Sequence, residues 1–166
     1  MIAELTGMDI SNASMYDGAT ATAEAAMMAW GNAKKATRVL VAATVDPKVR
    51  RVVDTYAHFH GFAIQLIPAK NGTLDREALD KELAEGGVAG VIVQQPNYFG
   101  IVEDYTGIAD AVHEQKGIFI VNANPSDLAI LKTPGEWGAD VAVGEGQSLG
   151  IPMTFGGPGV GFMACT

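Results

Sequence analysis

Residues 38–67 read RVLVAATVDPKVRRVVDTYAHFHGFAIQLI, and this segment indicates the fold most clearly. It begins and ends with apolar runs, residues 38–43 and 62–67, which predict two strands. Between them, Asp46 is a helix cap, Pro47 suits a first helical turn and Gly61 ends the helix, so residues 47–60 predict a helix. Strand, helix and strand in this order predict one βαβ unit with parallel strands.

The same alternation continues on both sides of this unit. Downstream, helices are predicted at 75–85, 104–115 and, in short form, 125–131; strands are predicted at 88–94, 117–121, 140–143 and 159–166. Upstream, a helix at 17–31 follows a short apolar helix at 2–5. Runs such as VLVA and VIV lack alternation of apolar and polar residues, as expected where helices cover both faces of a sheet. We predict a three-layer αβα sandwich with a mostly parallel sheet.

Composition narrows the class of protein. The 166 residues are 48% hydrophobic and 18% charged, with a formal net charge of -8 and no basic stripe, which argues against nucleic-acid binding. No apolar run approaches the roughly 20 residues that cross a bilayer, so we expect a cytoplasmic protein without membrane contact. A single cysteine, Cys165, makes no internal disulfide and is expected to pack as a small apolar residue. The chain starts at a short helix and stops inside a predicted strand, so we expect residues 1–166 to be one truncated domain.

Candidate binding residues lie in the loops, because open α/β sheets bind ligands beyond the carboxyl ends of their strands. Each candidate also has a purely structural explanation: Asp17 caps a helix, and Asn and Pro favour turns. Histidines 58, 60 and 113 are interpreted as surface residues, and no metal site is expected. The candidate loops are 16–20, 94–97, 122–126, 145–148 and 156–159.

One motif suggests dinucleotide binding and is rejected on its context. Residues Gly144, Gly146 and Gly150 fit a loose G-x-G-x-x-x-G pattern after a strand. A dinucleotide fingerprint opens a helix after the first strand of the sheet, whereas here Ile151 and Pro152 follow a late strand. We therefore do not expect NAD binding.

Three long strings resemble a known family. IAELTGMDISNASMYDGATATAEAAMMA, VQQPNYFG and GADVAVGEGQSLGIPMTFGGPGVGF resemble the P protein of the glycine cleavage system, in particular the first subunit of its two-subunit form. The resemblance spans nearly the whole chain. It implies the large domain of a pyridoxal-phosphate-dependent transferase of fold type I, and a heterotetrameric glycine dehydrogenase that decarboxylates glycine and transfers the aminomethyl group to the lipoyl group of H protein.

The resemblance also shows where cofactor-binding residues should lie, and this chain departs from the pattern at three places. The position of the imine-forming lysine, counted back from Ile151, is Gln147, and a carboxamide forms no imine. The phosphate loop reads Asp17, Gly18, Ala19, Thr20, with a carboxylate in place of serine. The residues expected to supply an acid for the cofactor ring are 121–124, VNAN, which contain none.

From these departures we expect no catalytic residue and no bound cofactor in this chain, with pyridoxal phosphate held by a second glycine dehydrogenase subunit. Candidates for the wall of that subunit's active site, or for the interface, are Asn97, Asn122, Asn124, Gln147 and Ser148. Two alternatives stay open: a self-sufficient pyridoxal-phosphate enzyme that uses Lys132 or a lysine beyond Thr166, and a non-catalytic α/β domain that binds a ligand or a protein.

Overall fold

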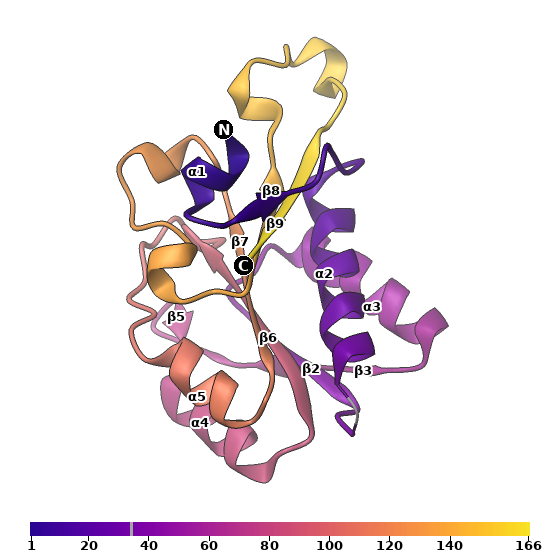
Figure 1. The fold of residues 1–166 in the computed structure, drawn as a ribbon, viewed down its shortest axis with the longest axis vertical. Helices are drawn as coiled ribbons and strands as arrows, with labels where there is room; N and C mark the ends of the chain where they lie inside the picture. The colour runs from indigo at the N-terminus through magenta and orange to yellow at the C-terminus, as the bar shows by residue number, and fades with distance from the viewer. Residues whose placement is uncertain (34) are drawn as a thin grey trace.

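The fold, known from a computed structural model that describes residues 1–33 and 35–166, is built on a seven-stranded sheet (Figure 1). The strand order is β1-β9-β8-β7-β6-β2-β3. Strands β3, β2, β6, β7 and β8 run parallel, whereas β9 is antiparallel to β8 and β1 is antiparallel to β9. These strands are β1 Ile10–Ser11, β2 Arg38–Ala42, β3 Ala63–Ile67, β6 Val88–Gln95, β7 Ile118–Ala123, β8 Val141–Glu145 and β9 Gly161–Cys165.

Helices cover both faces of this sheet. Figure 1 shows α2 and α3 packed together on one face and α4 and α5 on the other. The prediction of a three-layer fold with a mostly parallel sheet is therefore confirmed. The helices are α1 Ile2–Thr6, α2 Gly18–Asn32, α3 Pro47–His60, α4 Arg76–Glu85 and α5 Ile108–Glu114, with 3-10 turns η1 Asp127–Ala129, η2 Gly135–Trp137, η3 Gln147–Leu149 and η4 Thr154–Gly156.

The core lies on both sides of the central strands. Val39, Leu40 and Val41 on β2 are fully buried, as expected for a strand between two helical layers. Alanines of α2 face this core, and a Cβ on Gly90 of β6 would lie 3.0 Å from the Cβ of Ala29. Small side chains on α2 therefore let this helix approach the sheet closely.

The helix predicted at 104–115 is shorter than expected. It begins at Ile108, because Asp104 Oδ1 accepts hydrogen bonds from the backbone N–H (2.9 Å) and the hydroxyl (2.7 Å) of Thr106, which closes a turn before the helix. Gly107 then has a φ of 77°, outside the helical region. Tyr105 inside this turn is buried, and its hydroxyl donates to the Gln94 carbonyl at 2.7 Å.

Three further differences concern short elements. The helix predicted at 125–131 is reduced to the 3-10 turn η1, because the backbone leaves the helical region at Ile130, which has a φ of -126°. Strand β1 and the hairpin of β4 Ala69–Lys70 and β5 Thr73–Leu74 were not predicted, because two-residue strands carry no periodic signal. The other predicted elements are confirmed to within two residues at each end.

The sheet has a topological switch beside β2. The chain passes from β2 to β3 on one side and then crosses to β6 on the other side. The loops after β2 and β6 therefore diverge, and this divergence opens a crevice at the carboxyl ends of the strands. In the part of the chain that the structure describes, no helix combines the length and apolar character that a membrane span requires.

Candidate functional site

A cavity of about 500 Å³ opens at this switch point. Its wall combines the beginning of α2 and of α3 with the carboxyl ends of β6, β7 and β8, as the parallel strand order predicts. Of the predicted candidates, Asn122, Asn124, Gln147 and Ser148 all line it. The full lining is Asp17, Gly18, Ala19, Asp46, Lys48, Val49, Gln94, Pro96, Asn122, Ala123, Asn124, Glu145, Gln147 and Ser148.

The beginning of α2 is capped by side chains of the protein itself. Asp17 Oδ1 accepts from the backbone N–H of Thr20 at 2.8 Å, and the Thr20 hydroxyl oxygen accepts from the backbone N–H of Asp17 at 3.3 Å. These reciprocal bonds form a capping box. The predicted role of Asp17 as a helix cap is thereby confirmed.

Glu145, the last residue of β8, faces the same helix end. Its Oε2 accepts from the backbone N–H of Gly18 at 3.0 Å, while its Oε1 accepts from the N–H groups of Gln147 at 3.0 Å and Val160 at 2.8 Å. Helix N-termini favour anions because their first N–H groups have no partner within the helix. The carboxylate of Glu145 supplies such an anion from within the chain.

Gln147 lies in the 3-10 turn η3, directly after β8 and Gly146. Its Nε2 donates to the backbone carbonyls of Gly156 at 2.8 Å and Pro158 at 3.2 Å, across the glycine-rich loop. The side chain therefore ties two parts of this loop together at the edge of the cavity. The glycine motif that begins at Gly144 leads into the short 3-10 turns η3 and η4 and then into β9, instead of the long helix of a dinucleotide site.

Amide and hydroxyl groups make up the wall at the ends of β7. Asn122 is buried, and its Nδ2 donates to the Thr22 hydroxyl of α2 at 3.1 Å. Asn124 Oδ1 accepts from the Ser148 hydroxyl at 3.2 Å, and the hydroxyl of Ser126 lies 2.7 Å from that of Ser148. The loops after β7 and β8 are thus joined by short polar contacts.

The sequence interpretation missed the lysine of this cavity. Lys48, in the first turn of α3, is the one lysine that lines the cavity within residues 1–33 and 35–166. Asp46 beside it caps α3 by accepting from the Lys48 N–H at 2.7 Å, and its own N–H donates to Gln94 Oε1 at 2.9 Å. Lys48 could have been found from the βαβ pattern, because the helix after the first strand begins at the same edge as the other loops.

Lys132, the lysine that the self-sufficient enzyme hypothesis required, lies elsewhere. Its Nζ sits 3.8 Å from the centre of the Trp137 ring, in a cation–π contact. It is not part of the cavity wall as described. The structure therefore contradicts the use of Lys132 as a lysine of this site.

Asn97, the remaining candidate, does not line the cavity. It is 3% exposed, and its Nδ2 donates to Glu103 Oε1 at 2.7 Å and to the Gly72 carbonyl at 2.8 Å. Its Oδ1 accepts from the N–H groups of Phe99 and Ile101. Asn97 therefore organises the loop after β6 from inside, and this loop presents the exposed aromatic residues Tyr98 and Phe99.

Two turn carboxylates and one buried phenol have shifted pKa values. The hydrogen bonds from the Thr106 hydroxyl and N–H lower the pKa of Asp104, and those from the Thr133 N–H and hydroxyl lower the pKa of Glu136. Burial, followed by the nearby charge of Glu103, raises the pKa of Tyr105 far above its usual range. None of these three groups is among the residues of the cavity wall.

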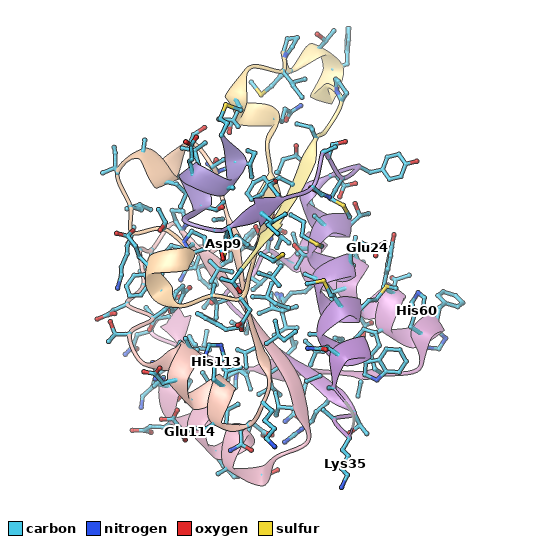
Figure 2. The ribbon with its side chains drawn as sticks, in the orientation of Figure 1. Asp9, Glu24, Lys35, His60, His113 and Glu114 are labelled. Atoms are coloured by element: carbon cyan, nitrogen blue, oxygen red, sulfur yellow. The ribbon has the colours of Figure 1, made fainter. Side chains whose placement is uncertain are left out.

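The histidines and the cysteine lie away from the cavity. Figure 2 shows His60 at the end of α3 and His113 on α5, on separate elements. His58, His60 and His113 are exposed, as predicted, and His113 Nε2 contacts Asp140 Oδ2 at 2.9 Å. Cys165 is half-buried and packs against the core. The described residues contain no group of three or more His, Cys, Asp or Glu side chains placed to hold a metal ion.

Comparison with known proteins gives consistent matches. Residues 1–166 match the family described as "Glycine cleavage system P-protein". The chain is 52% identical to a probable glycine dehydrogenase (decarboxylating) subunit 1 of Bacillus licheniformis, and 52% identical to the protein of the same description in Lysinibacillus sphaericus. Each match covers 100% of this chain and 37% of the relative. The chain therefore spans little more than a third of the length of these curated relatives.

Solved structures show the same relationship. A crystal structure of glycine decarboxylase (P-protein) of the glycine cleavage system, in inhibitor-bound form, matches with a TM-score of 0.90 and 44% identity, over 99% of this chain and 36% of that chain. Ureidoglycine-glyoxylate aminotransferase of Bacillus subtilis matches with a TM-score of 0.73 and 18% identity, over 99% of this chain and 41% of that chain. At that identity the likeness shows a shared fold.

Proposed function

The chain belongs to the glycine cleavage system P-protein family, and we propose that it is part of the first subunit of a glycine dehydrogenase (decarboxylating). In this proposal the subunit works with a second one to decarboxylate glycine and to transfer the aminomethyl group to the lipoyl group of H protein. The relatives' description as subunit 1 supports a partner subunit. Residues 1–166 would form one domain of the large, fold-type I kind.

The residues of the cavity do not fit pyridoxal phosphate. The N–H groups of Gly18 and Thr20, which would face a phosphate, already donate to Glu145 and Asp17. A phosphate dianion would meet these two carboxylates at close range, where like charges repel. At the end of β7, Asn122 gives its amide N–H to Thr22 and offers no carboxylate to a ring nitrogen. We therefore derive no catalytic step from this cavity.

The cofactor of the assembled enzyme would then be bound by the second subunit. The observation that carries this proposal is the combination of Gln147 at the expected lysine position with a helix end already occupied by Glu145. Lys48 does not replace the missing lysine in this account, because its surroundings include Asp17, Asp46 and Glu145 in the same wall and no free phosphate cradle.

The contribution of this chain would be an interface beside the partner's active site. The loops 94–97, 122–126 and 144–150 end at one edge of the sheet, and exposed apolar side chains lie close by in sequence: Tyr98, Phe99, Leu149, Met153 and Phe155. A surface of this kind suits burial against another protein. We propose a heterotetramer of two pairs of subunits, located in the cytoplasm, without contacts to nucleic acid or membrane.

The test is reconstitution of the complete subunits. The complete protein that contains this chain is produced alone, with its second subunit, and with lipoylated H protein present in both cases. Glycine-dependent exchange of labelled carbon dioxide is expected only from the pair. Activity of the first subunit alone would contradict the proposal. Failure of the two subunits to associate or to act together would favour a non-catalytic binding domain instead.

Two cavity-wall variants refine this test. Asn122→Ala and Gln147→Ala in the first subunit are expected to lower exchange by the pair, since the loops that carry them would border the partner's active site. Glu114→Gln, on the exposed face of α5, serves as the matched control and should leave exchange unchanged.

A further inference from the structure

One carboxylate joins three segments that are far apart in the sequence. Glu145 accepts from the N–H of Gly18 at the start of α2, and also from the N–H groups of Gln147 and Val160. Gln147 and Val160 are the two ends of the glycine-rich loop. A single half-buried side chain therefore holds both ends of this loop against one helix terminus.

The backbone around Glu145 is built for close contact. A Cβ on Gly18 would lie 2.7 Å from the backbone nitrogen of Glu145, so the helix start and the strand end meet without room for a side chain. The N–H of Gly146 donates to the Val160 carbonyl at 2.7 Å, directly beside the carboxylate. These contacts fix where Glu145 points, and the positive end of α2 favours its charge.

The segment that Glu145 holds is an arm, residues 146–160. In Figure 1 it projects beyond the sheet as the extension between β8 and β9. Its tip carries two exposed apolar side chains: Met153 is 82% exposed and Phe155 is fully exposed. The backbone of Phe155 has a φ of 49°. Gln147 adds side-chain hydrogen bonds across the arm, to the carbonyls of Gly156 and Pro158. The orientation of the arm therefore depends strongly on its base.

We propose that Glu145 is a positioning residue, an internal anion that occupies the anion-binding end of α2 in place of a cofactor phosphate and thereby orients the arm 146–160 toward the second subunit. The contact between the arm and the second subunit rests on the proposed function, whereas the hydrogen bonds by which Glu145 holds the base of the arm do not. A domain without the cofactor keeps its arm ordered in this way.

The charge on Glu145 is essential to this role. A carboxylate accepts at both oxygens, and hydrogen bonds to an ionised acceptor are stronger than those between neutral groups. A glutamine in its place has one oxygen and an NH₂ group, which would point at an N–H donor. Glu145→Gln therefore removes at least one of the three bonds, whereas Glu145→Asp retains the charge on a shorter side chain.

The first experiment measures amide hydrogen exchange on the complete chain. In Glu145→Gln, the amide of at least one of the three donors Gly18, Gln147 and Val160 is expected to exchange about tenfold faster or more, because the carboxamide offers a single oxygen to all three. The amides of Val91 and Ile92 in β6 should keep their rates, which shows that the variant is folded. Glu145→Asp should restore part of the protection, and Glu114→Gln should change nothing. Unchanged protection at all three amides, Gly18, Gln147 and Val160, in a folded Glu145→Gln variant would overturn the proposal.

The second experiment measures binding of the second subunit. Glu145→Gln is expected to weaken the association by about tenfold relative to the unchanged protein, and Glu145→Asp by less. Equal affinity of the unchanged protein and Glu145→Gln, despite faster exchange of the arm, would overturn the orientation toward the partner. If the unchanged protein fails to bind the second subunit while the exchange results are as expected, the proposed function fails and the hold of Glu145 on the arm stands.

Discussion

Among single residues, Gln147 limits the chemistry of the cavity most clearly, because its carboxamide forms no imine. Its Nε2 donates to the carbonyls of Gly156 and Pro158, so the side chain links two parts of the arm. The sequence placed Gln147, Ser148, Asn122 and Asn124 near one another, because each follows a parallel strand. It did not place Lys48 there, and it could not assign Asn97 to the interior, since burial of an amide depends on partners distant in the sequence such as Glu103.

Placing a lysine at position 147 should not by itself create a cofactor site. For Gln147→Lys we expect no stoichiometric adduct with pyridoxal phosphate after borohydride reduction, because Glu145 and Asp17 still fill the donors that a phosphate needs. Intact-mass measurement checks this, with the unchanged chain as control. A one-to-one adduct at the new lysine would show that the N-terminal end of α2 can still bind the cofactor phosphate.

Gly144 cannot accept a side chain. A Cβ there would overlap the carbonyl oxygen of Ala123 and lie 2.7 Å from the Phe162 ring. We expect Gly144→Ala to lower the free energy of unfolding by about 3 kcal/mol, measured by urea denaturation. Gly31→Ala is the matched control: nothing lies within 4 Å of a Cβ there, so helix propensity should raise stability by up to about 1 kcal/mol. Equal stabilities of the two variants would contradict this packing.

At the scale of elements, capping residues and apolar runs determined most helices and strands correctly. The helix of residues 47–60 was predicted with the bounds it has, because Asp46, Pro47 and Gly61 mark both ends. The segment at 104–107 was not predicted correctly, because Asp104 caps a turn as readily as it caps a helix. The buried hydrogen bond from Tyr105 to Gln94 favours the turn. Local sequence does not contain that contact.

The loop after β6 depends on a buried carboxylate. Glu103 accepts from Asn97 Nδ2 and from the Leu74 N–H, both at 2.7 Å, and so connects this loop to the β4–β5 hairpin. Glu103→Gln leaves a donor facing a donor and should lower the free energy of unfolding by about 2 kcal/mol. Glu114→Gln on exposed α5 should change it by less than about 0.5 kcal/mol. Urea denaturation that finds the two variants alike would contradict the role of Glu103.

For the molecule as a whole, the repeated strand and helix pattern predicted the parallel strands at the centre of the sheet. It did not predict the edge formed by β9 and β1. β9 is antiparallel to β8, and β1 pairs with β9 from the other end of the chain. Such pairing joins Ile10 to Cys165 and leaves no local signal in either segment.

Alkaline pH should destabilise the whole fold through Tyr105. Burial and the charge of Glu103 raise its pKa above the unfolded value of about 10, so its contribution to stability is complete below that pH and is lost as the pH rises above it. The free energy of unfolding should fall by up to about 1.4 kcal/mol per pH unit from this group. Urea denaturation between about pH 9 and 11 should show that the free energy of unfolding falls less steeply with pH in Tyr105→Phe than in the unchanged protein. The exposed Tyr16→Phe should have the same slope as the unchanged protein. Identical slopes in all three proteins would contradict this assignment.

We propose that this chain holds no covalently bound cofactor and that the partner subunit binds it. The most direct measurement is intact mass after pyridoxal phosphate and borohydride are added to the two complete subunits, separately and together. We predict one reduced adduct on the second subunit and none on the subunit that contains this chain. One adduct per copy of this chain, at Lys48 or at any other lysine, would contradict the account.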